Sequence, residues 1–164
     1  MPTPEPAALQ LVKLWYPESA EEVVSWCAHI HMQSVLPEAI IIDDLDVFIT
    51  QSKNPEHGAA RLIAALVDAA AWIASKSERC KLIFTASHRV TVLPSVLRQF
   101  HFRIAELQKS SAGGENDFQL TLTHPSSSSK NVVTVDYTIT GDNIMLRTVT
   151  SRSLPTDKTV VPAV

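Results

Sequence analysis

The chain has 164 residues, of which 45% are hydrophobic and 19% charged, and its formal net charge is -3 at pH 7. This composition is that of an ordinary globular domain, which excludes a disordered or fibrous chain. The small negative charge gives no general reason to expect nucleic-acid binding, although it does not exclude a local basic surface. The two cysteines, Cys27 and Cys80, lie in apolar segments. They are expected to be buried free thiols, and a disulfide is the less favoured alternative.

The two ends of the chain are proline-containing and differ from the middle. Residues 1–8 are predicted to be disordered, as are residues 151–164, so a single domain over residues 9–150 is expected. No stretch approaches the ~20 continuous apolar residues of a membrane helix. The first residues also lack the basic and apolar regions of a secretory signal. A cytosolic or nuclear protein with no membrane contact is therefore expected.

The first part of the chain alternates strand and helix signals. Residues 9–15 form a short apolar run that predicts a strand. Ser19 can cap a following helix, in which Glu21 and Glu22 occupy the favourable first turn. The apolar face of this helix is made of Val23, Val24, Trp26, Cys27 and Ile30.

A strand–helix–strand unit is predicted next. Residues 38–44 form a strand whose continuous apolar run, Ala39–Ile42, is typical of a strand covered on both faces. After a polar loop over residues 51–58, residues 59–76 predict a helix that is apolar on nearly every side, and hence interior or under a second layer. Residues 81–85 predict a second buried strand. Together these elements predict a right-handed βαβ unit with parallel strands.

The last part of the chain predicts a different kind of sheet. A short helix over residues 94–100 and a strand over 102–107 precede a Gly/Ser turn at 110–116. Three further segments alternate apolar with polar residues, which indicates antiparallel strands with one face in water. These segments are residues 118–123, 132–139 and 144–148, joined by a loop at 125–130 and a hairpin turn at 141–143.

Four apolar residues followed by an acid have the general form of a Walker B strand. Asp43 would then order a water of the Mg²⁺ shell, and Asp44 or Asp46 would polarise the attacking water. The alternative is that Asp43 or Asp44 only solvates the strand end or caps a turn. A phosphate-binding loop requires Gly-x-x-x-x-Gly-Lys-Ser/Thr, and no glycine of this chain is followed by lysine. The sequence therefore contains no self-sufficient nucleotide site.

Two further groups of residues are candidate binding sites. A spacing of two on a helix points His29 and His31 apart, and no Cys/His set completes a zinc site. A locally basic region follows the second buried strand. Ligands of open α/β sheets meet the loops at the strand carboxyl ends, so this region is a candidate DNA-binding surface. An ordinary solvated surface is the favoured alternative on sequence alone. The basic residues are His88, Arg89, Arg98, His101 and Arg103.

The order of these segments resembles the second half of a RecA-type recombinase ATPase core. The resemblance rests on residues 36–46, the helix 60–71, the strand 82–87 and the strand 102–107 with its following antiparallel strands. Within that superfamily the chain is most similar to the SWIM-domain-associated recombinase paralogues, the ATPase-like subunits of animal Shu-type complexes. Residues 9–29 add to this likeness, which covers roughly residues 9–148.

The resemblance implies a partial RecA-like α/β core, with a mostly parallel sheet flanked by helices and C-terminal antiparallel strands. It implies a nuclear role in homologous recombination repair of DNA. Such proteins pair with a SWIM-domain zinc-finger protein, bind single-stranded DNA and support recombinase filaments. Asp43 occupies the family's metal position, and Thr85 or Ser87 the position of a nucleotide sensor.

The resemblance leaves three functions open, and with them whether the chain is an enzyme. The first is a DNA-repair accessory subunit that binds DNA and a partner without hydrolysis. The second is a DNA-stimulated ATPase whose ATP- and Mg²⁺-binding loop lies in a longer form, of which this chain is an alternative product, an incomplete sequence or a diverged member. The third is a structural α/β interaction domain. An exposed sheet edge also predicts poor solubility of the chain alone.

Overall fold

The computed structural model describes residues 10–87, 90–110, 114–125, 129–141 and 143–155. Of the ends predicted to be disordered, residues 1–8 and residues 156–164 lie outside the described residues. The chain divides into two compact units, one of residues 10–100 and one that contains the residues from 101 onward. The first unit is α/β and the second consists of antiparallel strands.

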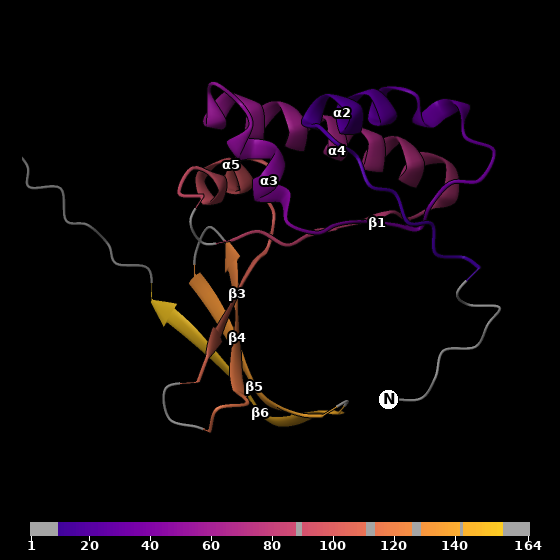
Figure 1. Ribbon diagram of the computed structural model, residues 1–164. Helices are drawn as coiled ribbons and strands as arrows, with labels where there is room; N and C mark the ends of the chain where they lie inside the picture. Colours follow the sequence, from indigo (N-terminus) through magenta and orange to yellow (C-terminus); the bar gives the residue numbers. More distant parts are fainter. Residues whose placement is uncertain (1–9, 88–89, 111–113, 126–128, 142, 156–164) are drawn as a thin grey trace, which may run out of the picture. The chain divides into compact units, whose positions relative to one another are not determined.

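The first unit carries the helices and the parallel strands (Figure 1). β1 and β2 pair in parallel, with Ala39 opposite Lys81 and Ile42 opposite Phe84. The predicted strand–helix–strand unit is therefore confirmed in its parallel pairing. The elements are α2 (Ala20–Ala28), the 3₁₀ helix η1 (Ile30–Met32), β1 (Ala39–Ile42), α3 (Leu45–Thr50), α4 (Pro55–Ser77), β2 (Lys81–Phe84) and α5 (Leu93–Gln99).

α4 is the central helix of this unit and contacts α2, α3, α5 and β2. By length and composition alone it could cross a membrane, and in this structure one of its faces packs against the other elements of the unit. One face is fully buried, whereas Arg61, Ala64 and Asp68 form an exposed stripe. The predicted burial of this helix is thus confirmed for one side only, because the other elements pack on that side. The largest fully buried side chains of the unit are Leu45, Ile49, Leu62, Ile63, Leu66, Ile73 and Val96.

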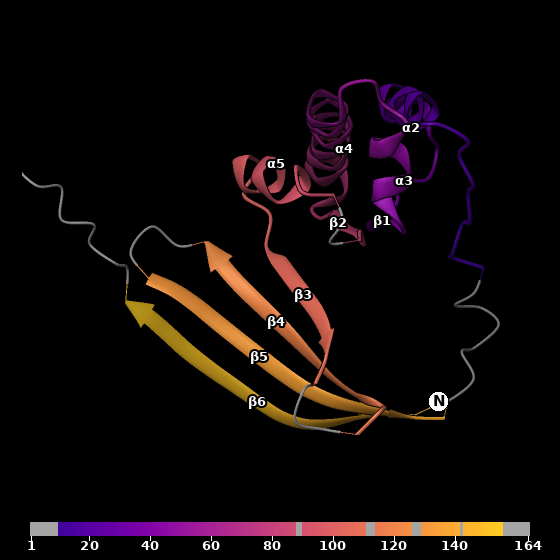
Figure 2. The same ribbon diagram turned by 60° about the vertical axis from the view of Figure 1, so that its left-hand side comes forward.

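The two parallel strands are covered on one face, not on both as predicted. Ile40 and Leu82 are half-buried, whereas Ile41 is 69% exposed and Ile83 48% exposed on the opposite face. The helices all lie on one side of the strands (Figures 1 and 2). Continuous apolar sequence predicts two buried faces, but within the described residues only one layer of helices is present.

Three other sequence predictions differ from the structure of this unit. Residues 12–17 have no regular secondary structure, although the sequence predicts a strand over 9–15. A strand is stable only when its backbone is paired, and here Trp15 packs against Trp26 with ring centroids 5.9 Å apart. Helix α3 has no counterpart among the predicted elements. α4 begins at Pro55 rather than residue 59, because Asn54 accepts a hydrogen bond from the His57 N–H at 3.2 Å and proline suits the first helical position.

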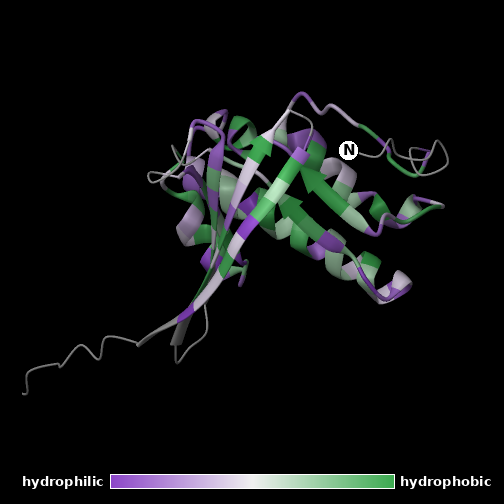
Figure 3. Cartoon of the chain, turned by 90° about the horizontal axis from the view of Figure 1, so that it is seen from below, coloured by the Kyte–Doolittle hydropathy of each residue, from purple (hydrophilic) through white to green (hydrophobic). Residues whose placement is uncertain are grey.

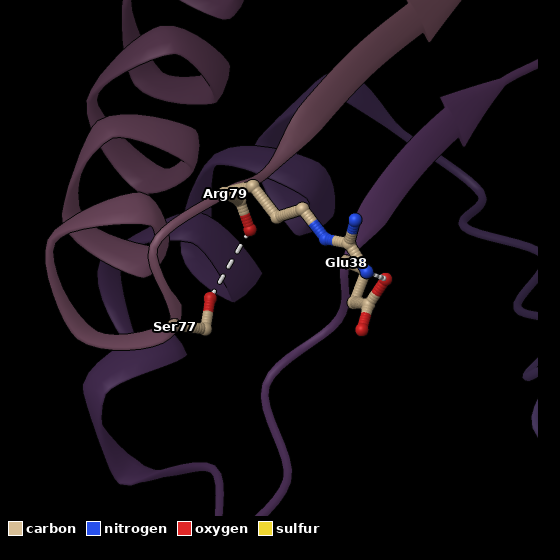
Figure 4. Close-up of polar contacts among 3 residues, drawn as sticks. All are labelled: Glu38, Ser77 and Arg79. Atoms are coloured by element: carbon tan, nitrogen blue, oxygen red, sulfur yellow. Dashed lines mark hydrogen bonds and ion pairs between the residues drawn. The ribbon is translucent and has the colours of Figure 1, made fainter.

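The amino ends of β1 and β2 are held together by the residues just before each strand (Figure 4). Arg79 forms an ion pair with Glu38 at 2.8 Å, and the Ser77 hydroxyl donates a hydrogen bond to the Arg79 carbonyl at 3.1 Å. The Lys81 N–H donates to the Glu38 carbonyl at 2.9 Å. Both charged side chains are 69% exposed, so the ion pair contributes at most about 1 kcal/mol and the backbone bond sets the alignment.

The second unit is a four-stranded antiparallel sheet in the order β3-β4-β5-β6 (Figure 2). The predicted antiparallel strands are confirmed and are longer than expected. β6 continues through residues 151–155, where the sequence predicts a disordered tail, because its backbone pairs with residues 129–133 of β5. The strands are β3 (Ile104–Lys109), β4 (Asp117–Pro125), β5 (Ser129–Thr140) and β6 (Asn143–Pro155).

The strands of the second unit alternate apolar and polar residues (Figure 3), so the sheet has one apolar and one polar face, as predicted. Gln108, Gln119 and Asp136 align across the polar face, and Gln119 donates a hydrogen bond to Asp136 at 2.9 Å. Two aligned rows of side chains across neighbouring strands form the centre of the apolar face. They are Leu107–Leu120–Val135–Val149 and Phe118–Tyr137–Leu146.

Candidate functional site

The carboxyl ends of β1 and β2 bring together the residues that the sequence singles out for nucleotide chemistry. The Thr85 N–H donates to the Ile42 carbonyl at 2.9 Å, which continues the parallel ladder by one bond. The Thr85 hydroxyl then donates to the Asp43 carboxylate. Asp43, the predicted metal-position residue, and Thr85, one of the two predicted sensor residues, are therefore direct hydrogen-bond partners.

Asp44 turns the chain from β1 into α3. Its φ of 52° lies in the left-handed region, which aspartate tolerates better than most residues. In this conformation the Asp44 N–H donates to the Thr85 hydroxyl oxygen at 3.0 Å. The Asp44 side chain is exposed and makes no capping hydrogen bond to α3. Of the two structural alternatives for Asp44, a solvated strand end therefore fits better than a cap.

Asp46 holds the loop that follows β2. It lies in the first turn of α3, and its carboxylate accepts a hydrogen bond from the Ser87 N–H at 3.1 Å. The Leu45 N–H donates to the Thr85 carbonyl at 2.9 Å. Asp43 and Asp46 thus tie the end of β1 and the start of α3 to the residues after β2.

The same residues do not make a metal cage. Among the described residues no group of three or more His, Cys, Asp or Glu side chains is placed to hold a metal ion. Mg²⁺ in phosphate-binding sites takes one or two protein carboxylates and completes its shell with phosphate oxygens and water. Asp43 fits the role of a single such ligand. It lies at the carboxyl edge of the parallel strands, the place where ligands of α/β proteins bind.

The predicted DNA-binding residues are only partly described. His88 and Arg89 lie outside the described residues. Arg98 is exposed on α5, where its guanidinium Nε donates to the Pro94 carbonyl at 3.1 Å. Arg103 is exposed in the other unit. Among the predicted DNA-binding residues, Arg98 is thus the one that the structure describes in the helical unit.

An open groove between α2 and α4 has no counterpart in the sequence analysis. Its volume is about 400 Å³, and its lining includes Cys27, His31, Asp68 and Trp72. Burial raises the pKa of the Cys27 thiol to about 11, so this cysteine is protonated and unreactive at neutral pH. Cys27 is therefore not an activated nucleophile in this groove.

The cysteine prediction is met in part. Cys27 and Cys80 are both free thiols, as predicted, although Cys80 is only half-buried. His29 makes a contact of 2.7 Å between its Nδ1 and the Ser25 carbonyl one turn earlier in α2. This contact engages the Nδ1 atom of the imidazole with the backbone of α2.

A second polar cluster lies in the antiparallel sheet and is not evident from the sequence. Asp117 is 6% exposed. It accepts hydrogen bonds from the Thr138 hydroxyl at 2.6 Å and the Gly114 N–H at 2.8 Å. Arg147 reaches the same carboxylate at 3.1 Å from an irregularity in the β5–β6 pairing. The extra residue of such a bulge re-aims its side chain. Both oxygens of the Asp117 carboxylate thus have hydrogen-bond or ion-pair partners, which is typical of a carboxylate that stabilises the fold.

Comparison with protein-family models, with curated proteins and with solved structures finds no match to this chain. What the geometry defines is an α/β protein with a small parallel sheet and a separate four-stranded antiparallel sheet.

Proposed function

We propose that this protein is an accessory subunit in homologous recombination repair, which binds single-stranded DNA and a SWIM-domain zinc-finger partner to support recombinase filaments. The single observation that supports this most directly is the hydrogen bond between Thr85 and Asp43. This bond joins the end of β1, where the resemblance to RecA-type cores places the metal-binding residue, to the end of β2, where it places the nucleotide sensor. The partner and the nuclear location rest on that resemblance alone.

Binding without hydrolysis is the form of the proposal that the residues favour. Asp43 and Asp46 already hold side-chain or backbone groups at the end of β2. A catalytic carboxylate needs a bound nucleotide opposite it, and the phosphate-binding motif is not in this sequence. Under this proposal Asp43 and Asp46 order the residues that follow β2 and take no part in phosphate hydrolysis.

The DNA role is tested by fluorescence anisotropy with labelled single-stranded DNA over a salt series. We expect an affinity that falls with salt, because phosphate contacts release counterions. The variants Arg89→Glu and Arg98→Glu should weaken binding and lower the salt slope by about 0.7 for each phosphate that the variant no longer neutralises. Lys76→Glu is the matched control, since Lys76 is exposed near the end of α4 that leads into the amino end of β2. Unchanged binding in both arginine variants excludes the proposed surface.

The ATPase alternative has a separate test. A longer form that carries a Gly-Lys-Ser or Gly-Lys-Thr loop should hydrolyse ATP with DNA stimulation, and Asp43→Asn should abolish that hydrolysis. Hydrolysis that survives Asp43→Asn would remove Asp43 from the metal role.

A structural interaction domain is the second candidate, and the exposed apolar surfaces favour it. Ile41 and Ile83 lie open on one unit, and the apolar face of the other carries two aligned rows of apolar and aromatic side chains. A chain that shows no salt-dependent affinity for single strands, but assembles through these surfaces, would establish this candidate in place of the first.

A further inference from the structure

An exposed apolar segment precedes the first helix of the helical unit. Residues 12–17 have no regular secondary structure, and the neighbouring Leu11 is 86% exposed and Tyr16 83%. Trp15, by contrast, packs against Trp26 of α2. Large apolar side chains in water cost free energy, and packing beside a neighbouring strand recovers part of that cost. The segment therefore gains stability wherever it can join a sheet.

The outer edge of β1 can accept such a strand. The carbonyls of Glu38 and Ile42 accept hydrogen bonds from β2 and its following residue. Because backbone groups alternate in direction along a strand, the N–H and C=O of Ile41 point away from β2. Among the described strands none pairs with this edge of β1. The Ile41 backbone thus offers one donor and one acceptor to a further strand.

The handedness of the connections selects the edge of β1 over that of β2. Crossovers between parallel strands are right-handed, and α2 and α4 lie on the same side of the strands (Figures 1 and 2). Two crossovers of the same hand over the same face step across a sheet in the same direction. Since α4 leads from β1 to β2, a strand that α2 joins to β1 lies on the other side of β1. Figure 2 shows the residues before α2 on that side.

Strand geometry also determines which backbone groups face β1. Ile42 is half-buried on the helix side, and its carbonyl points toward β2. A parallel strand of L-residues keeps the same relation between the side-chain face and the direction of the backbone groups. Because Trp15 packs on α2, the N–H groups of Trp15 and Lys13 in such a strand point toward β1. Those of Leu14 and Tyr16 point toward solvent.

We propose that residues 11–16 form a strap that closes on the outer edge of β1 as a third parallel strand, in the order strap–β1–β2. Closing pairs the open edge of the sheet and places Leu14 on the same face as Ile41. The described part of the strap and β1 belong to one compact unit, so closing needs no second copy. The proposal does not depend on the DNA-repair function, because no residue of the carboxyl edge takes part in it.

Amide hydrogen exchange of the full chain, followed by nuclear magnetic resonance, tests the strap. We expect the Lys13, Trp15 and Ile41 amides to exchange about 10-fold or more slowly than in an unstructured chain. The Leu14 and Tyr16 amides should exchange rapidly, and the pattern should not change with protein concentration. Rapid exchange at all five positions overturns the proposal. Protection that grows with concentration overturns it as well, because the strand then comes from another copy.

Two proline variants test the direction of pairing. Lys13→Pro removes a donor that faces β1, and should return the Ile41 amide to rapid exchange. Val12→Pro is the matched control, because the Val12 N–H points toward solvent and proline is tolerated at such edge positions. Both residues are exposed and outside regular structure, so both variants should fold. Equal exchange of the Ile41 amide in the two variants, whether slow or rapid, overturns the proposed pairing.

Discussion

Thr85 bonds to several backbone and side-chain groups at the end of the neighbouring strand. Its N–H donates to the Ile42 carbonyl, and its carbonyl accepts from the Leu45 N–H. Its hydroxyl donates to the Asp43 carboxylate and accepts from the Asp44 N–H. A side chain with one donor and two acceptor sites can serve both aspartates. Serine offers the same hydroxyl, whereas valine offers the same shape without it.

Thr85→Val should destabilise the helical unit. The change leaves the Asp43 carboxylate and the Asp44 N–H without their protein partner, which costs about 1–2 kcal/mol because water replaces the hydroxyl only in part. Urea unfolding followed by circular dichroism measures the loss. Thr91→Val is the control, because Thr91 is exposed and lies outside this network. Equal stability of the two variants would contradict a holding role for Thr85.

The buried carboxylate of Asp117 makes the antiparallel unit sensitive to acid. The Thr138 hydroxyl, the Gly114 N–H and the Arg147 guanidinium hold the pKa of Asp117 below its usual value. A carboxyl group whose folded pKa is depressed contributes stability above its unfolded pKa and loses it as the pH falls through the folded pKa. The contribution is therefore present at neutral pH and declines below about pH 4.

Asp117→Asn should lower the melting temperature at pH 7 and flatten its decrease below about pH 4. Thermal unfolding at a series of pH values from neutral to acidic checks both effects. Glu115→Gln is the control, since Glu115 is exposed two residues away. If Asp117→Asn retains the full acid dependence of the wild type, other carboxylates are responsible for it.

Among the elements, α4 shows how the start of a helix is set by its neighbours. Ser52 exchanges hydrogen bonds with the Asn54 backbone at 3.0 and 3.3 Å. The Asn54 side chain then caps α4. Gly58 lies in the first turn, directly against Ser52. A Cβ at Gly58 would approach the Ser52 Cβ to 2.7 Å, a distance that real Cβ atoms avoid.

Gly58→Ala should therefore destabilise α4, although alanine is the better helix former by about 1 kcal/mol. The gain in helix propensity is opposed by the steric contact with Ser52, and overpacking costs about 1–3 kcal/mol. The double variant Gly58→Ala, Ser52→Gly removes the contact and should recover stability relative to Ser52→Gly alone. A double-mutant cycle by urea unfolding measures the coupling. A single Gly58→Ala variant that is more stable than wild type would show that the contact relaxes freely.

Across the molecule, exposed apolar surface is the main feature of both units. In the helical unit, Ile41 and Ile83 face away from the helices. Both edges of the two-stranded sheet are also unpaired within the described residues. Open edges and faces of this kind promote association and aggregation.

Ile41→Thr with Ile83→Thr should reduce aggregation of the chain with little change in stability. Both residues are about half exposed or more, so the change removes few native contacts, and threonine keeps the β-branched shape that strands favour. Light scattering during heating measures aggregation, and urea unfolding measures stability. Ile40→Thr is the contrasting control, because Ile40 is half-buried on the helix side and its change should lower stability. Unaltered scattering in the double variant would show that aggregation starts from another surface.

Local patterns in the amino-acid sequence were enough to predict the type and order of most elements. The strongest were the Ser19 cap, the apolar run Ala39–Ile42, the long alanine-rich helix and the period-two alternation of the last strands. These signals act within one element, so they can be interpreted without knowing what lies beside it. The positions of Asp43 and Thr85 at strand ends followed from the same signals.

Which faces are covered and which side chains meet depends on tertiary packing. An apolar run predicts burial but does not tell whether one layer or two will pack on it, and so Ile41 is exposed. Residues 12–17 remain outside any strand because an edge pairs only with a partner in space. The Thr85–Asp43 bond joins residues 42 positions apart, and the Asp117–Arg147 pair depends on a bulge in the β5–β6 register. Such contacts arise from strand pairing over long sequence distances, which no local pattern encodes.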